Sequence, residues 1–446
     1  MKHAFGSERV VLFSYFLILI LIGTFLLSLP VAWAGSDGLK GIDALFTSVS
    51  AVCVTGLITV DTALYSLFGQ FIILLLIQFG GLGILTFTTV IFISTNKSKK
   101  VSLRNLQTVR NFYLDSIEFK AHHILSNILI LTISFELIGT LLLFFKFRSS
   151  LSGAEALFYA LFHAVSAFCN AGFSLFSDSL NGYASDPVFM IIIMGLIICG
   201  GLGFLVYNDI INVVKNEKKR LSLHTHIVLK TTAALLVIGA LLFFVLEWSW
   251  TGNEMSLLDK IMNAIFQSVT PRTAGFNAVD QNSLSAASKA LTIILMFIGG
   301  SPASIAGGIK TTTFAIVFLA IIKGADSNGR IRLGDRAIPS SIVSRGMLFL
   351  GKAVTLLISS IFLLTITEMG KGSATSFFSI VFESVSAFGT VGLSTGLTPL
   401  LSLAGKYIII VTMFAGRVGI ISMTIQLFKE HDENIVDYPE EEVLIG

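Results

Sequence analysis

The chain has 446 residues, of which 54% are hydrophobic and 13% are charged, and its formal net charge is +3. Soluble domains carry about 25% charged residues, so this composition, with a mean hydropathy of +0.85, excludes an ordinary soluble protein and indicates one embedded in a membrane. The small net charge gives no sign of nucleic-acid binding. The three cysteines are an odd number in apolar surroundings, which predicts packed thiols rather than disulfides.

The first apolar run extends from Val10 to Pro30, behind Lys2 and Arg9. It is longer than the apolar part of an ordinary signal peptide, so we interpret it as a retained membrane span. Each run of this kind has close to the roughly 20 residues that a helix needs to cross a bilayer. Three similar runs follow along the chain, at about 124–147, 227–250 and 347–368.

A shorter, semi-apolar stretch follows each of these runs, at about 42–53, 154–169, 257–271 and 375–389. These stretches are too short to cross a bilayer and predict re-entrant helices. A second long run then completes each unit, at about 67–94, 188–214, 288–322 and 402–428. The sequence therefore predicts an all-α integral membrane protein of four M1–P–M2 repeats, with eight transmembrane helices and four re-entrant pore loops around one pseudo-fourfold pore.

The repeats divide the chain into ordered segments. The predicted repeats are residues 1–95, 122–215, 227–323 and 346–429. Predicted cytoplasmic linkers separate them at 96–121, 216–226 and 324–345, and a cytoplasmic tail follows at 430–446. Because every repeat has two spans, all four enter the membrane in the same orientation, which argues against an inverted-repeat transporter.

A glycine recurs just after each re-entrant stretch. A fourfold glycine in a membrane protein suggests four loops that meet on one axis, as in an ion filter. Glycine adopts backbone angles that turn a carbonyl toward such an axis, and oxygen ligands suit a hard cation. The predicted filter residues are Val54, Thr55 and Gly56; Asn170, Ala171 and Gly172; Thr273, Ala274 and Gly275; and Thr390, Val391 and Gly392.

The second run of the third repeat is rich in helix-breaking residues. Proline removes a backbone donor and glycine weakens a helix, so this run is predicted to unwind below the filter and to act as an intramembrane gate. A kinked packing helix is the alternative. The candidate gate residues are Gly299, Gly300, Ser301, Pro302, Ala303, Ser304, Gly307, Gly308, Lys310 and Arg417.

Two of these candidates, Arg417 and Lys310, are basic. Arg417 stands where the matching spans have Gly81 and Gly201. An arginine at membrane depth is costly and normally faces water or a partner, so we expect it to project into the cavity below the filter, where it repels cations or holds the gate closed. A buried ion pair is the alternative. Lys310 either extends to the cytoplasmic face or lines the pore mouth.

Lysine and arginine concentrate in the three predicted linkers, whereas the loops beside the re-entrant stretches are poorer in them. Cytoplasmic loops carry such an excess, so both termini and the linkers are predicted to be cytoplasmic. Residues 95–121 combine basic and apolar positions, which fits either a docked partner or anionic membrane lipids. The acidic tail from Glu430 to Glu442 is predicted to make dimer contacts or to stay mobile.

Three motifs carry a family resemblance: Val-Thr-Pro-Arg-Thr-Ala-Gly-Phe at 269–276, Gly-Gly-Ser-Pro-Ala-Ser at 299–304 and Gly-Gly-Ile-Lys-Thr-Thr-Thr at 307–313. They resemble the Trk/Ktr/HKT superfamily of cation transporters. The short N-terminus is similar to the KtrB-type membrane subunit of bacterial Ktr systems. The resemblance implies potassium uptake across a bacterial plasma membrane, typically sodium-dependent, by a homodimer. It also implies a cytoplasmic ring of KtrA-like RCK-domain subunits, which bind adenine nucleotides.

The same resemblance bears on selectivity. In plant members, a serine at the first filter position accompanies sodium selectivity, and this chain has Gly56 there. The resemblance therefore implies K+ as the transported ion. A sodium-selective or unselective cation pathway on the same fold is one alternative. An intramembrane enzyme is a distant one, because the polar residues align as repeated backbone turns rather than as a nucleophile with a base.

Other polar residues give weaker signals. Glu136 and Asp209 are candidate pathway acids, and Arg272 is predicted to support the scaffold by pairing with Glu383 or another acid. No histidine pair has a third ligand at metal-binding spacing. The glycines at 80–83 follow no predicted strand, so no nucleotide site is predicted in this chain.

Overall fold

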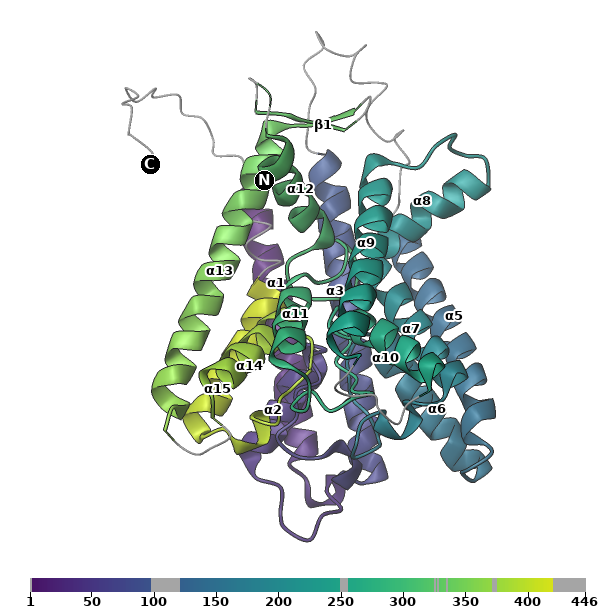
Figure 1. The fold of residues 1–446 in the computed structure, drawn as a ribbon, viewed down its shortest axis with the longest axis vertical. Coiled ribbons are helices and arrows are strands. Elements are labelled where there is room, and N and C mark those ends of the chain that lie inside the picture. The colour runs from purple at the N-terminus through teal and green to yellow at the C-terminus, as the bar shows by residue number, and fades with distance from the viewer. Residues whose placement is uncertain are drawn as a thin grey trace.

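The computed structural model describes residues 2–97, 121–248, 256–324, 326, 329–333, 336–370 and 375–419. Helices dominate this part of the chain (Figure 1). Two short strands, β1 (Ile331–Leu333) and β2 (Arg336–Ile338), pair antiparallel, with Ile331 opposite Ile338. Single 3-10 turns occur at Pro30–Ala32, Thr62–Leu64, Asn181–Tyr183 and Thr398–Leu400.

A long apolar helix opens each quarter of the chain. These helices carry outward-facing leucine, isoleucine and phenylalanine side chains, as expected of surfaces that contact lipid. By length and composition they are the four helices in the described residues that are able to cross a membrane singly. They are α1 (Lys2–Leu27), α5 (Ala121–Phe147), α9 (Leu223–Leu246) and α13 (Ser340–Glu368).

A short helix follows each long one. The C-terminal half of each short helix is buried, whereas the N-terminal end is partly exposed. Ser256 and Ser376 cap two of them by accepting hydrogen bonds from the amides of Asp259 and Ser379, which satisfies donors left free at a helix start. The four short helices are α2 (Gly41–Val52), α6 (Gly153–Phe168), α10 (Leu257–Val269) and α14 (Phe377–Gly389).

The remaining helices are interrupted in the second and third quarters. In the first quarter, α3 (Leu67–Lys97) is continuous. The others are α7 (Pro187–Leu202) with α8 (Phe204–Val214), α11 (Ala286–Phe297) with α12 (Thr311–Lys323), and α15 (Leu403–Phe414) with the π-helical turn η6 (Ala415–Gly419). Residues 298–310 lie between α11 and α12, outside any helix.

One expected span is not a single helix. The sequence suggested a continuous run over 188–214, but α7 ends at Leu202 and α8 leaves at 91° to it. Gly203 forms the break with a φ of +83°, a backbone conformation that glycine adopts without steric cost. Counting this bent pair as one span gives at most five membrane-crossing elements in the described residues; the count of eight stays a prediction.

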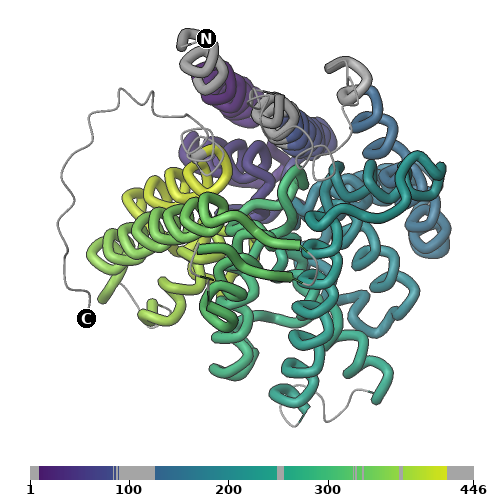
Figure 2. The backbone as a smooth tube through the Cα atoms, turned by 90° about the horizontal axis from the view of Figure 1, so that it is seen from above, coloured from purple at the N-terminus to yellow at the C-terminus, as the bar shows by residue number. Residues whose placement is uncertain are grey.

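The four quarters follow one another around the molecule. Seen from above in Figure 2, the colours run in chain order around a centre, and the last quarter returns to the first. Helix α15 packs against α2, where Lys406 Nζ lies 2.6 Å from Asp43 Oδ1. In Figure 1 the start of α1 and the β1–β2 hairpin lie at one end and the α2 region at the other.

Two expectations fall outside the described residues. The basic surface at 95–121 falls almost wholly in the gap 98–120, and the acidic tail lies beyond Gly419. Their proposed roles therefore stay predictions.

Candidate functional site

Four loops leave the C-termini of the short helices and run into the four glycines Gly56, Gly172, Gly275 and Gly392, here called the ring glycines. All four have positive φ, from +69° to +97°. Each loop begins at the C-terminus of a short helix. Such a helix end carries partial negative charge, so the four loops begin at four sites of that charge. The structure thus gives the four predicted loops one shared local geometry.

The residue two places before each ring glycine is also strained. Val54, Asn170, Thr273 and Thr390 have φ values of +54°, +56°, +72° and +49°. Three of these residues are β-branched, for which positive φ is a true outlier. Strain of this kind costs about 1–3 kcal/mol per residue and gathers at functional sites. Four equivalent outliers therefore mark the loops as something other than ordinary connections.

The loops close into a ring. A Cβ atom added to Gly56 would lie within 3.0 Å of the Ala171 carbonyl oxygen, closer than real Cβ atoms approach. The same relation links each loop to the next and the last to the first. Gly172 faces the Ala274 oxygen, Gly275 faces the Val391 oxygen, and Gly392 faces the Thr55 oxygen. The four loops thus meet edge to edge, and four backbone oxygens lie between them.

A hydroxyl group from each short helix supports its loop. In the first and fourth loops, Ser50 Oγ and Ser386 Oγ accept hydrogen bonds from the amides of Gly56 and Gly392, at 3.0 and 3.1 Å. In the other two, the Ser166 and Thr270 hydroxyls donate to the carbonyls of Phe173 and Phe276, both at 2.7 Å. These four supports were not predicted from the sequence, although the tripeptide Val-Ser-Ala, which recurs around Ser50, Ser166 and Ser386, was a usable signal.

Glycines of the later helices allow those helices to approach the ring. A Cβ on Gly80, Gly200 or Gly416 would come within 3.0 Å of the carbonyl oxygen of Val52, Phe168 or Phe388, near the ends of α2, α6 and α14. No side chain fits there without moving backbone. The third repeat departs, because Gly299 faces the Gly307 oxygen instead. Close packing therefore explains why a glycine recurs at this place in three of the four repeats.

Residues 298–310, here called the central loop, fold back on themselves. The Gly299 amide donates to the Ile309 carbonyl at 2.8 Å, and the Thr311 amide donates to the Gly300 carbonyl at 3.0 Å. Residues 298–309 are all buried. Ala303 adds a further positive φ of +56°. The loop is thus a compact, enclosed segment rather than a surface connection.

The central loop contacts the other three repeats. The Ser301 amide donates to the Gly201 carbonyl at 3.0 Å, and the Phe204 amide donates to the Ala303 carbonyl at 2.8 Å, which fastens the loop to the α7–α8 break. On the fourth repeat, a Cβ at Gly307 would come within 3.0 Å of Thr390 Oγ1. On the first, a Cβ at Gly81 would lie 3.3 Å from Ile305 Cγ2. The loop therefore lies at the centre of the four repeats.

Two basic residues lie at this loop, Arg417 beside it and Lys310 at its end. Arg417, in η6, is buried, and its Nε and Nη2 atoms have no hydrogen-bond partner in the described part of the chain. It lies within electrostatic range of Lys310 and of Cys53 and Cys169, which follow α2 and α6 directly. Lys310 Nζ turns back and donates to the Ala306 carbonyl, so it caps the loop and does not extend away from it.

The predicted pairing of Arg272 with Glu383 is wrong. Arg272 Nη2 donates to the Gly299 carbonyl at 3.2 Å, so the arginine joins the third ring loop to the central loop. The Glu383 carboxylate instead accepts hydrogen bonds from the chain that leaves the fourth ring loop, at Ser394, Thr395 and Thr398. Both groups are buried, and each finds a nearer partner within its own surroundings.

The weaker candidates hydrogen-bond to neighbouring helices and their caps. Glu136 Oε2 accepts from Gln78 Nε2 at 3.0 Å, between α5 and α3. Asp209 accepts from the Ser222 amide and the Thr225 hydroxyl, both at 2.7 Å, and ties α8 to the start of α9. No group of three metal-ligating side chains occurs among the described residues. Glu136 Oε1 also lies 3.9 Å from Cys169 Sγ, just before the second ring loop.

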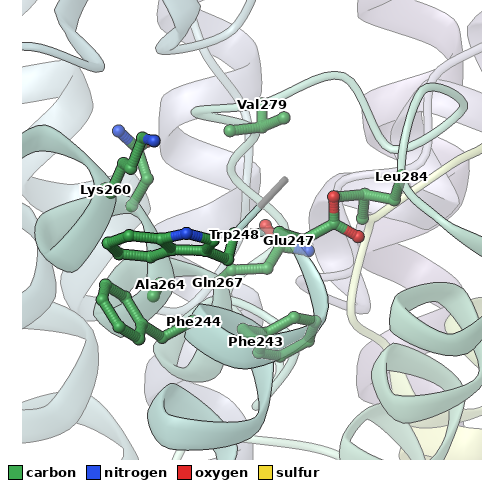
Figure 3. A pocket seen from close by; sticks show the side chains of 10 residues that line it. Phe243, Phe244, Glu247, Trp248, Lys260, Ala264, Gln267, Val279 and Leu284 are labelled. Carbon is green, nitrogen blue, oxygen red and sulfur yellow. The ribbon is translucent and has the colours of Figure 1, made fainter. Parts of the chain in front are cut away.

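A pocket lies beside the ring, between α9 and α10 (Figure 3). Lys260 Nζ stands 4.8 Å from the centroid of the Trp248 ring, a cation–π arrangement. Gln267 of α10 also lines the pocket. No ring glycine is among its lining residues, so this pocket is separate from the axis of the four loops.

Four like loops that bring backbone oxygens together within a helical membrane protein define a class, the proteins that let cations cross membranes. The chain belongs to the TrkH family of cation transport proteins, whose model matches residues 2–438. The predicted resemblance is thereby confirmed. Because this is a family of cation transport proteins, the enzyme alternative is set aside.

Individual relatives match nearly the whole chain. It is 40% identical to the Ktr system potassium uptake protein B of Bacillus subtilis, over 99% of this chain and 97% of that protein. It is 38% identical to the potassium/sodium uptake protein NtpJ of Enterococcus hirae, over 97% and 95%. The crystal structure of the potassium transporter TrkH from Vibrio parahaemolyticus superposes with a TM-score of 0.69, covering 93% of this chain and 85% of that one. At 22% identity, that likeness concerns the fold alone.

Proposed function

We propose that this chain takes up potassium ions through one pore whose selectivity filter is built from the four ring loops. The closed ring of Gly56, Gly172, Gly275 and Gly392 is the observation that carries the proposal. Potassium as the ion is supported by the names of the two relatives described above, a potassium uptake protein and a potassium/sodium uptake protein.

The proposed filter works by replacing water. A potassium ion that enters the ring loses hydration oxygens and gains backbone carbonyl oxygens. The oxygens of Thr55, Ala171, Ala274 and Val391, each beside the next ring glycine, form one such layer in this proposal. The partial negative charge at the ends of α2, α6, α10 and α14 favours a cation there. The hydroxyl supports keep the layer from collapsing when no ion is bound.

The proposed pore has four units, each with a span, a re-entrant helix and a second, often broken, span. Spans α1, α5, α9 and α13 face lipid, and the short helices point their C-termini at the axis. The basic linkers place the end with the β1–β2 hairpin in the cytoplasm under the positive-inside rule. The ring loops then enter from outside, which suits uptake.

The central loop is the proposed gate. It is buried, lies among all four repeats and is fastened to the α7–α8 break by two backbone hydrogen bonds. The positive charge of Arg417 opposes passage of a cation at close range. Deleting part of 303–308 should therefore raise ion flux. Unchanged or lost flux in a variant that reaches the membrane in normal amount would count against a gate here.

Three further properties are proposed from the resemblance to Ktr systems. We propose that transport depends on sodium, that the membrane chain forms a homodimer, and that a cytoplasmic RCK-domain ring binds nucleotide and controls the gate. A relative named as part of a Ktr system supports a partner subunit. In this proposal, helix α8, which Asp209 ties to the start of α9, connects the regulatory ring to the central loop.

An unselective or sodium-carrying pathway is the second candidate. The name of the Enterococcus hirae relative includes both potassium and sodium. Gly56 at the first filter position favours potassium, because a serine there accompanies sodium selectivity in plant members of the superfamily that this chain resembles. The relative flux of the two ions distinguishes the candidates.

The test is rubidium uptake by cells that lack their own high-affinity potassium systems. Intact protein is compared with Gly56→Ser and Gly275→Ser, each at matched membrane level. We expect intact protein to restore uptake at low potassium and each serine to weaken potassium relative to sodium. If intact protein transports but neither serine changes the ion preference, the filter assignment is wrong. If intact protein moves no ion, even together with a Ktr cytoplasmic subunit, the proposed function is wrong.

A further inference from the structure

The four short helices carry one polar residue at the same place relative to the ring. Thr47, His163, Gln267 and Glu383 lie nine residues before the ring glycine in repeats one, two and four, and eight before it in repeat three, by subtraction of residue numbers. Repeat three is one residue shorter at this point. All four side chains are buried, although they belong to four different chemical types.

Each of these side chains holds the segment that leaves the ring. The Tyr65 hydroxyl donates to Thr47 Oγ1 at 3.0 Å, and His163 Nε2 lies 3.1 Å from Ser174 Oγ. Gln267 Nε2 donates to Gln281 Oε1 at 2.8 Å. Figure 3 shows Gln267 among the side chains that line the neighbouring pocket.

Glu383 makes the densest set of these contacts. Its Oε1 accepts from the Ser394 hydroxyl at 2.5 Å and the Thr395 amide at 3.1 Å, and its Oε2 accepts from the Thr398 hydroxyl at 2.6 Å. The side chain is 0% exposed. A buried carboxylate with three donors is satisfied without a basic partner, because hydrogen bonds replace its lost hydration.

Repeats two and four share the receiving turn as well. Ser174 Oγ accepts from the Phe176 amide, and Ser394 Oγ accepts from the Gly396 amide, both at 3.0 Å. The two serines stand at the same distance after their ring glycines. The same turn thus meets the same helix position in two repeats, although the helix residue is histidine in one and glutamate in the other.

We propose that these four residues, here called the outer anchors, are positioning residues that fix the geometry of the filter and so its preference for potassium. The inference rests on the proposed function above. Each loop is held on its inner side by a hydroxyl from the short helix, as Ser386 holds Gly392 at 3.1 Å. The outer anchor holds the far side of the same loop. A strained loop tied at both sides keeps its carbonyl oxygens at fixed separation, which the fit to one ion requires.

Glu383 allows the holding role to be separated from a role of its charge. In Glu383→Gln, the amide oxygen can still accept from Ser394 and the Thr395 amide. The amide nitrogen can donate to the Thr398 hydroxyl, because a hydroxyl both donates and accepts. Glu383→Ala leaves all three donors without an acceptor, which is costly for buried groups.

The experiment compares Glu383→Ala, Glu383→Gln and the control Ser384→Ala in the full chain, by rubidium uptake with sodium as competitor. Ser384 is buried on the same helix, but its hydroxyl bonds the Ile380 carbonyl of that helix at 2.8 Å. We expect the alanine variant at 383 to lose potassium preference by about tenfold or more. The glutamine variant should stay within about threefold of intact protein, and the control should be unchanged.

Two results would overturn the proposal. The first is a normal ion preference in Glu383→Ala. The second is a loss of potassium preference in Glu383→Gln as large as that in Glu383→Ala, which would assign the role of Glu383 to its charge. If the alanine variant does not reach the membrane, Thr398→Val decides, since it removes one of the three donors; normal preference there also overturns the proposal. Gly275→Ser in the same assay tests the proposed filter itself. If Gly275→Ser shifts the ion preference and the Glu383 variants do not, only the proposed role of the outer anchors is rejected.

Discussion

Replacing one ring glycine by alanine tests the closed ring most sharply at Gly392. Its φ is +97°, and a Cβ there would come within 3.0 Å of the Thr55 carbonyl oxygen, whereas ordinary contact begins at 3.4 Å. That oxygen belongs to the backbone of another ring loop and not to a flexible side chain. Gly392→Ala should therefore displace the first loop as well as the fourth.

The size of the effect has two parts. A side chain at positive φ costs about 1–2 kcal/mol in backbone strain. The collision adds a displacement of the Thr55 oxygen, and a misplacement of about 1 Å can cost a positioned site on the order of 100-fold. We expect uptake at low rubidium concentration to fall between about tenfold and 100-fold, with a smaller change in maximal rate.

Gly396→Ala is the matched control. Gly396 lies in the same segment with a φ of +87°, but no atom lies within 4 Å of its added Cβ. It therefore carries the backbone strain without the collision. Uptake is measured over a range of rubidium concentrations, with both variants at equal membrane level. Equal loss in the two variants, or none in Gly392→Ala, would refute the inference that Gly392 faces a neighbouring loop.

Three further changes have clear expected results. Ser386→Ala removes the acceptor of the Gly392 amide and should weaken potassium preference in competition uptake, whereas Ser384→Ala should not. Lys406→Met leaves the Asp43 carboxylate buried without its partner and should lower the free energy of unfolding by about 3–5 kcal/mol. This loss appears as a lower unfolding temperature, which the additional change Asp43→Asn should largely restore. Gly203→Ala crowds the Pro302 and Ala303 carbonyls and should alter ion flux without changing ion preference. Unaltered flux would contradict the inference that the α7–α8 bend is coupled to the central loop.

The repeating pattern allowed much of the architecture to be anticipated. Four long apolar runs became α1, α5, α9 and α13 because length and composition decide whether a helix can span a bilayer. Four short stretches became buried helices ahead of the ring glycines. The glycine and proline content of 299–308 indicated an interruption, and helix is absent from 298–310. Local propensity was sufficient at each of these places.

Contacts between repeats could not be anticipated. Gly203 lies in a Gly-Gly-Leu-Gly run like the one at 80–83, where helix α3 stays continuous, and its break is bonded to a loop that arrives from the next repeat through Ser301 and Ala303. The partner of Arg272 was misjudged for the same reason, since opposite charge suggested Glu383 whereas packing placed a carbonyl nearer. The outer anchors differ in residue type, so a search for identical letters passes over them; only their common place on the helix relates them.

The most direct test of the central account is to locate the ion. Crystals of the full chain grown in rubidium, measured at the rubidium absorption edge, would show where the ion binds. The account predicts anomalous density on the axis between the carbonyl oxygens of Thr55, Ala171, Ala274 and Val391, and its loss or displacement in Gly275→Ser. Rubidium density elsewhere in the protein, with none among the four ring loops, would contradict it.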